Sequence, residues 1–162
     1  MIGKNDNYNK RLFESIVNGV DRPQMKMRSS RVEEEHLLQT AVCKWFRLQY
    51  RQFEKMLYAI PNGGFRGKAT AAKLKAEGVV AGVADLCLAV PRGGYGALYI
   101  EMKQRGNYQQ PNQKEWQKAC EMAGNKYVVC KSIEEFMREV NAYMYLPSAK
   151  MLMNELERLR RK

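Results

Sequence analysis

Two carboxylates and a lysine interrupt the most apolar part of the sequence. Asp85 begins one apolar run, and Glu101 and Lys103 lie near the end of the next, beyond a glycine-rich turn. If the turn of this predicted hairpin centres near Gly93 and Gly94, Asp85 falls opposite or diagonal to Glu101. Because side chains alternate between the two faces of a strand, Glu101 and Lys103 share one face. The spacing therefore predicts an acidic pair with a lysine beside it.

Such a pair has a definite chemistry. Two carboxylates held close together repel each other unless a cation or a proton lies between them. Their hard oxygen atoms suit Mg²⁺ or Mn²⁺, which keep several water ligands and accept phosphate oxygens. A lysine two residues after Glu101 can contact the scissile phosphate or the attacking water. The alternative is a solvated strand face with a cross-strand ion pair.

Two polar residues outside the hairpin favour the metal site. Glu35 borders the apolar face of a helix expected from Ser30 to about Tyr50, where a carboxylate needs a partner. Otherwise it is an acid that the dipole of the helix start stabilises. A later helix is expected over about residues 112–123, and Gln113 lies one turn before Trp116 on the same face of it. This spacing places the Gln113 amide beside the sheet. The alternative is that Gln113 is a plain polar residue at the helix start.

The segment "PNGGFRGK", residues 61–68, offers a second place for a phosphate. It follows a strand expected over "KMLYAI" and supplies backbone amides and basic side chains. It is not a Walker A loop, because position 62 is Asn and position 69 is Ala. A plain turn is the alternative. The nucleic-acid contacts that we expect in and after this segment are Asn62, Arg66, Lys68 and Lys73.

The composition restricts the class of protein. The chain has 162 residues, with 28 Lys and Arg against 17 acidic residues and a formal net charge of +11. This excess favours a polyanionic partner, nucleic acid before membrane, and the apolar runs are too short to span a bilayer. No signal peptide is expected at the start. The four cysteines form no CxxC pair, which predicts reduced core thiols in a cytoplasmic protein.

The predicted elements alternate in an order typical of the α/β class. They run helix, strand, short helix, hairpin, helix, strand, helix, which indicates a mixed sheet of about four strands flanked by helices. Ser132 and Glu135 match a capping box at the start of the last of these helices. We expect a basic arm over residues 1–29, a domain over 30–146 and a charged helix over 147–162.

Several ordered motifs carry a family resemblance. The segments "EHLLQTAVCKWF", "IPNGG", "KAEGVVAGVADLCL", "LYIEMK" and "NQKEW" resemble the VRR-NUC nucleases of the PD-(D/E)XK, restriction-endonuclease-like superfamily. The small stand-alone members of phages and bacteria look most similar, and the resemblance covers about residues 33–143. Ala84 stands where many members carry proline. The basic pair behind the family name is not evident, since Val79, Val80 and Ala81 precede Gly82.

The resemblance implies a restriction-endonuclease-like core and a role for each candidate residue. Asp85 and Glu101 would bind Mg²⁺ or Mn²⁺, joined by the backbone carbonyl of Met102 and by Glu35 as the helix acid. Lys103 would be the catalytic lysine. The catalytic set implied in this way is Glu35, Asp85, Glu101, Lys103 and Gln113.

We therefore expect a metal-dependent endonuclease that hydrolyses DNA, in a bacterial or phage-infected cell. Small stand-alone members look like junction-resolving enzymes that work as dimers, which implies a homodimer acting on four-way (Holliday) junctions or other branched DNA. The alternatives are an RNA-directed nuclease and a basic nucleic-acid-binding protein without catalysis. The acidic set argues against the binding protein, since binding alone does not need it.

Overall fold

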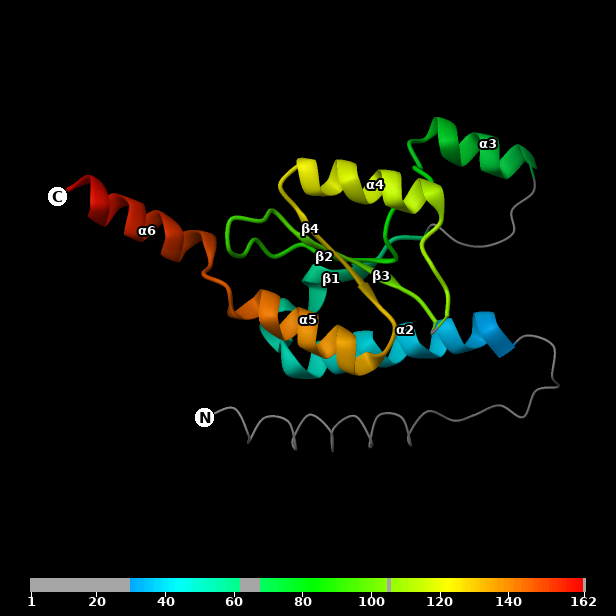
Figure 1. Cartoon of the computed structure of the whole chain (residues 1–162), viewed down its shortest axis with the longest axis horizontal. Coiled ribbons are helices and arrows are strands. Elements are labelled where there is room, and N and C mark those ends of the chain that lie inside the picture. The colour runs from blue at the N-terminus through cyan, green and yellow to red at the C-terminus, as the bar shows by residue number, and fades with distance from the viewer. Residues whose placement is uncertain (1–29, 62–67, 105, 162) are drawn as a thin grey trace. The chain divides into compact units, whose positions relative to one another are not determined.

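The computed structural model describes residues 30–61, 68–104 and 106–161 (Figure 1). The basic arm expected over residues 1–29 lies outside this part of the chain, and so do Asn62 and Arg66. The chain divides into two compact units, residues 1–54 and 55–162, and each is described by itself.

The first unit contains the long helix expected from the apolar spacing. Helix α2 covers Ser30–Gln49, and a 3-10 helix, η1, follows over Arg51–Met56 and ends in the second unit. The ring of Tyr50 packs against Trp45 and Phe46, with centroid separations of 6.0 Å and 5.3 Å. Among the side chains of α2 that the structure describes, the buried apolar ones recur at helical spacing: Ala41, Val42, Trp45 and Phe46.

The second unit is built on a four-stranded mixed sheet, as predicted. Its strands, in the spatial order β1-β2-β3-β4, are Leu57–Ala59, Leu86–Leu88, Leu98–Met102 and Lys126–Cys130. The β1–β2 and β2–β3 pairs are antiparallel, and β3 and β4 are parallel. The strand expected over residues 55–60 is shorter, because β1 extends only where three-residue β2 pairs with it, and Lys55 and Met56 belong to η1.

The hairpin has the register that the glycine turn predicts. Leu86 pairs with Ile100 and Leu88 with Leu98, so continuing the register by one residue places Asp85 opposite Glu101. Gly93 has a φ of 57°, and Gly94 a φ of 88°, values that L-residues rarely adopt. The turn therefore lies where the sequence predicted it.

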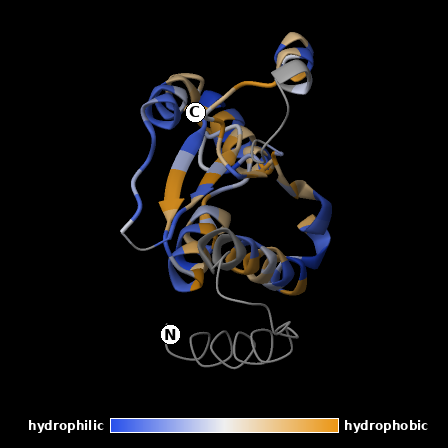
Figure 2. Cartoon of the chain, turned by 90° about the vertical axis from the view of Figure 1, so that its right-hand side faces the viewer, coloured by the Kyte–Doolittle hydropathy of each residue, from blue (hydrophilic) through white to orange (hydrophobic). Residues whose placement is uncertain are grey.

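Two helices cover opposite faces of this sheet (Figure 1). Helix α4 (Pro111–Met122) packs Trp116 against Tyr99 of β3, with ring centroids 4.9 Å apart. Helix α5 (Ile133–Tyr145) covers the other face, and the hydroxyl of Tyr143 donates to the Val90 carbonyl at 2.8 Å. Figure 2 shows that much of the strands between these helices is hydrophobic.

Helices α3 (Lys68–Ala76) and α6 (Ala149–Arg160) complete the second unit. The hydroxyl of Ser132 accepts from the Glu135 backbone N–H at 3.2 Å and begins α5 as predicted. The Glu135 carboxylate accepts from the N–H of Lys131 at 2.7 Å, one residue earlier than in a standard capping box. The backbone N–H of Lys131, just before the helix, therefore also has a side-chain acceptor.

The thiols match the sequence expectation. Cys87, Cys120 and Cys130 are buried and Cys43 is half-buried, and all four are free. Burial raises the pKa of Cys130 to about 12, so this thiol stays protonated and inert. Within the described residues, no helix has the length and apolar character needed to cross a membrane.

Candidate active site

The sheet itself positions Asp85. Its backbone carbonyl accepts from the N–H of Ile60 at 2.8 Å, which continues the pairing of β1 with β2. Its carboxylate Oδ2 accepts from the backbone N–H of Met102, also at 2.8 Å. Strand β2 begins at Leu86, so the backbone of β2 does not extend far enough to pair with the N–H of Met102. The Asp85 side chain accepts this N–H instead. Both contacts fix this carboxylate at the end of the hairpin.

Glu101 is a buried charged residue with three polar partners. Its side chain is 1% exposed, and its Oε1 lies 2.6 Å from Nζ of Lys103. The same oxygen accepts from Nε2 of Gln113 at 2.5 Å. The hydroxyl of Tyr127 donates to Oε2 at 3.3 Å. Residues from β3, α4 and β4, far apart in sequence, therefore meet around one carboxylate.

The acidic pair is electrostatically costly without a cation. Burial raises the pKa of Glu101, and the neighbouring Asp85 carboxylate raises it further. Lys103 and Tyr127 act in the opposite direction, because both donate to the ionised form. A divalent cation between the carboxylates would favour the ionised form much more strongly than these donors do.

The amide of Gln113 has a defined orientation. Its Oε1 accepts from the backbone N–H of Gln110 at the start of α4, at 2.8 Å. Its Nε2 is therefore left to donate to Glu101. A glutamate here would keep the bond to the helix start but would place a third carboxylate against Glu101. Glutamine thus satisfies the helix end and the site together.

A glycine allows α4 to come this close. Gly82 has a φ of 87°, and a Cβ on it would lie 2.5 Å from the backbone carbonyl oxygen of Asn112. Only two residues lie between Gly82 and Asp85. The close approach therefore ties the first turn of α4, which carries Gln113, to the segment that leads into the acidic pair.

Sequence reasoning missed Tyr127. It lies in β4, accepts from Nε2 of Gln109 at 3.3 Å and donates to Glu101. Gln109 also donates to Oε1 of Gln117 at 2.9 Å. The alternation of "KYVVC" places Tyr127 and Val129 on one face, but the parallel pairing of β4 with β3 has no local signal in the sequence.

The donor set fits a hard divalent cation. Mg²⁺ binds through one or two carboxylates and fills its other positions with water and phosphate oxygens. Asp85 and Glu101 supply the carboxylates. In a strand, the N–H and C=O of one residue point to the same side, so the Met102 carbonyl faces the Asp85 side of β3. The described residues contain no cluster of three His, Cys, Asp or Glu side chains that would hold a metal alone.

The structure brings together four of the five residues in the predicted catalytic set: Asp85, Glu101, Lys103 and Gln113. Glu35 lies in α2, and its side chain is outside the described part of the chain, as is that of Lys68 at the start of α3. Lys73 is exposed and lies 3.8 Å from Glu77. The backbone N–H of Ile60 donates to the Asp85 carbonyl, so residues 62–67 follow in sequence soon after a residue that contacts the site. Residues 62–67 themselves lie outside the described part of the chain.

Comparison with known proteins identifies the class. A family model described as the VRR-NUC domain matches residues 18–134. A solved structure described as a VRR_NUC domain protein is 31% identical, with a TM-score of 0.62; the match covers 70% of this chain and 90% of that one. Among curated proteins, none matches. The mixed sheet between helices is thus the restriction-endonuclease-like fold, and the chain belongs to the VRR-NUC family, a family of nucleases.

The sequence departs from the family pattern at two places, and the structure shows the surroundings of both. Ala84, in place of proline, is fully buried in a cluster with Cys120 of α4 and Tyr127 of β4. Val79 and Val80, which precede Gly82 in place of a basic pair, are 40% and 54% exposed. Neither departure alters a residue that contacts Glu101.

Proposed function

We propose that this protein is an endonuclease that hydrolyses DNA with Mg²⁺ or Mn²⁺ held by Asp85 and Glu101. The observation that carries the proposal is the buried Glu101 carboxylate, opposite Asp85 and within 2.6 Å of Lys103, in a chain of the VRR-NUC family. A pair of acids at a sheet end destabilises the metal-free fold and becomes favourable around a divalent cation. The net charge of +11 supports a polyanionic substrate.

Each described residue of the site has a role that follows from its contacts. Asp85 and Glu101 would hold the cation, with the Met102 carbonyl beside them. Glu35 is the remaining acid of the set that the family resemblance implies. A divalent cation held there would lower the pKa of a water molecule and neutralise charge on the phosphate. Nζ of Lys103 lies 2.6 Å from Oε1 of Glu101, where its ammonium group would stabilise negative charge on the scissile phosphate. Gln113 holds Glu101 in position.

A cleavage assay with matched substrates tests this function. The purified protein is incubated with DNA and RNA of one sequence in Mg²⁺, Mn²⁺ or EDTA. We expect internal cuts in DNA that need a cation. Cutting restricted to RNA would favour the RNA-directed alternative. Tight DNA binding without cleavage in any metal would favour the binding protein.

We also propose that the DNA substrate is branched and that the enzyme works as a homodimer. One chain offers one metal site, yet resolving a four-way junction takes two opposed cuts, which a twofold pair provides. Helix α6 supports a second copy as partner, since four large apolar side chains on it are more than half exposed: Met151, Met153, Leu156 and Leu159.

Two measurements test the finer proposal. Light scattering at micromolar concentration should give twice the mass of the 18.8 kDa chain. Cleavage should be faster on a four-way junction or a flap than on nicked, linear or single-stranded DNA of the same sequence. A monomer that cuts linear duplex and junction equally well would contradict the proposal while leaving the nuclease function intact.

A further inference from the structure

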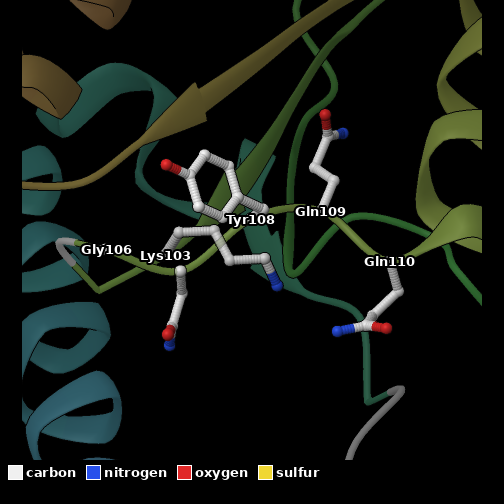
Figure 3. Close-up of a pocket in the computed structure, with 6 residues that line it drawn as sticks. Lys103, Gly106, Tyr108, Gln109 and Gln110 are labelled. Carbon is white, nitrogen blue, oxygen red and sulfur yellow. The ribbon is translucent and has the colours of Figure 1, made fainter.

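The loop between β3 and α4 carries an exposed aromatic ring beside the candidate active site. Tyr108 is 79% exposed, far more than Tyr99 or Tyr127 in the adjoining core. It borders a pocket of about 390 Å³, at the small end of ligand pockets in general. The residues that line this pocket are Lys103, Gly106, Asn107, Tyr108, Gln109 and Gln110 (Figure 3).

The lining is polar and carries one cation, Lys103, together with the ring of Tyr108, and a second lysine lies over that ring. Nζ of Lys131 lies 5.3 Å from the centroid of the Tyr108 ring, within the range of a cation–π contact. Asn107, Gln109 and Gln110 contribute amides to the lining, which suit the polar edge of a planar ligand. An aromatic ring, amide groups and two lysines together match the flat face, polar edge and anionic phosphate of a nucleotide.

The position of the pocket relates that nucleotide to the candidate active site. Lys103 lines the pocket and also lies 2.6 Å from Glu101. A base against Tyr108 would therefore belong to the nucleotide whose phosphate meets Lys103, or to its neighbour. In a continuous duplex both faces of a base are covered by adjacent bases. The Tyr108 ring can therefore receive a base only where the stack is interrupted.

We propose that Tyr108, with Lys131 and the amides of this loop, is a stacking site for an unpaired nucleobase next to the scissile phosphate. The inference rests on the proposed function. It gives a physical reason why the enzyme would prefer branched DNA, since unpaired bases occur at branches. Stacking on an aromatic ring is tolerant of base identity, because every base has a π face. The site thus recognises an unpaired nucleotide without reading sequence.

Binding to forked DNA with and without bases tests the proposal. Fluorescence anisotropy is measured in EDTA, so that no cleavage occurs, on forked duplexes in which one of the first three unpaired nucleotides is abasic. An abasic nucleotide keeps its phosphate and loses its π face. Three variants are compared with the wild type: Tyr108→Ala, Tyr108→Phe and, as control, Tyr145→Ala.

The control removes an equally exposed ring elsewhere. Tyr145 is also 79% exposed, and it precedes Leu146, which contacts Gly93 at the turn of the hairpin, away from Asp85 and Glu101. Both alanine variants should keep the melting temperature of the wild type, since neither ring is buried. A difference between them therefore reports the position of the ring.

The wild type, Tyr108→Phe and Tyr145→Ala should each lose about fivefold or more in affinity at one abasic position, the fold-change that one stacked base produces. Tyr108→Ala should bind the intact and abasic forks equally. If Tyr108→Ala responds to abasic sites as the wild type does, the stacking site is wrong, whereas the nuclease still stands if it cuts DNA. Absence of both DNA binding and cleavage would overturn both proposals.

Discussion

At the scale of single residues, the site depends on one buried carboxylate and the donors around it. Glu101 is held by Lys103, Gln113 and Tyr127, and it lies opposite Asp85 in the hairpin. Each donor offsets part of the cost of burying a negative charge. The three donors that hold Glu101 are thus also residues on which the fold depends; in the proposed function, they keep this carboxylate in place for a cation.

Lys103→Ala should lower the cleavage rate by about 100-fold or more, as expected when a group that stabilises transition-state charge is removed. DNA affinity should fall little, because the net charge of +11 spreads phosphate contacts over many residues. Single-turnover cleavage and anisotropy on one substrate separate the two effects. Lys126→Ala, at the other end of the β3–β4 ladder, is the control. A parallel loss of binding and cleavage would make Lys103 a phosphate anchor.

The raised pKa of Glu101 predicts a pH dependence of stability in the metal-free protein. Above the ordinary value of 4.5, the unfolded chain has lost this proton while the native state still holds it. The free energy of unfolding therefore receives a contribution that is present at low pH and is lost as pH rises through the raised native pKa. Glu101→Gln lacks this contribution, so its stability relative to wild type should improve over that window.

Urea unfolding in EDTA from about pH 4.5 to neutral pH measures this difference. Glu115→Gln, which removes a carboxylate at an exposed position of α4, is the control. A difference between Glu101→Gln and wild type that is constant with pH would show that the native pKa of Glu101 is not raised.

At the scale of elements, α4 must approach the sheet closely enough for Gln113 to reach Glu101. Gly82 permits this, because its Cα lies against the backbone of Asn112. Tyr99 and Trp116 pack between the same helix and β3. The position of the helix therefore sets the geometry of the site.

Gly82→Ala should destabilise the fold and reduce activity. Two causes would act together, backbone strain at positive φ and a steric clash with α4, and Gly78→Ala separates them. Both glycines have positive φ, 87° and 96°, so each alanine incurs a strain of about 1–2 kcal/mol. A Cβ at Gly78 meets nothing within 4 Å, whereas one at Gly82 meets the Asn112 carbonyl. Denaturant unfolding and cleavage rates should show a larger loss for Gly82→Ala. Equal losses in both variants would rule out the close approach as the cause.

Local periodicity accounts for the parts of the site that could be predicted. The alternation of β3 and a turn centred on Gly93 fix the pairing of Asp85 with Glu101, and the helical spacing from Trp116 points Gln113 to the sheet. Non-local contacts could not be predicted. The parallel β3–β4 pairing that brings in Tyr127 crosses a whole helix, and the contact at Gly82 depends on where that helix packs.

At the scale of the whole molecule, charge governs the encounter with the substrate. The excess of 28 basic over 17 acidic residues predicts binding that depends on salt more than on sequence. The logarithm of the binding constant on duplex DNA should fall linearly with the logarithm of salt concentration, by about 0.9 per phosphate contact. Anisotropy titrations at several salt concentrations measure the slope. A strong preference for one duplex sequence at fixed salt would contradict recognition by shape and charge.

The central claim is that Asp85 and Glu101 hold the catalytic cation. Asp85→Asn and Glu101→Gln remove one charge each while keeping an oxygen acceptor, and Glu115→Gln removes a charge at an exposed position of α4. The most direct measurement is DNA cleavage together with calorimetric Mg²⁺ binding for these three variants and the wild type. The wild type and Glu115→Gln should bind Mg²⁺ and cut, and the two site variants should do neither. Undiminished cleavage by either site variant, or by the wild type in EDTA, would contradict the claim.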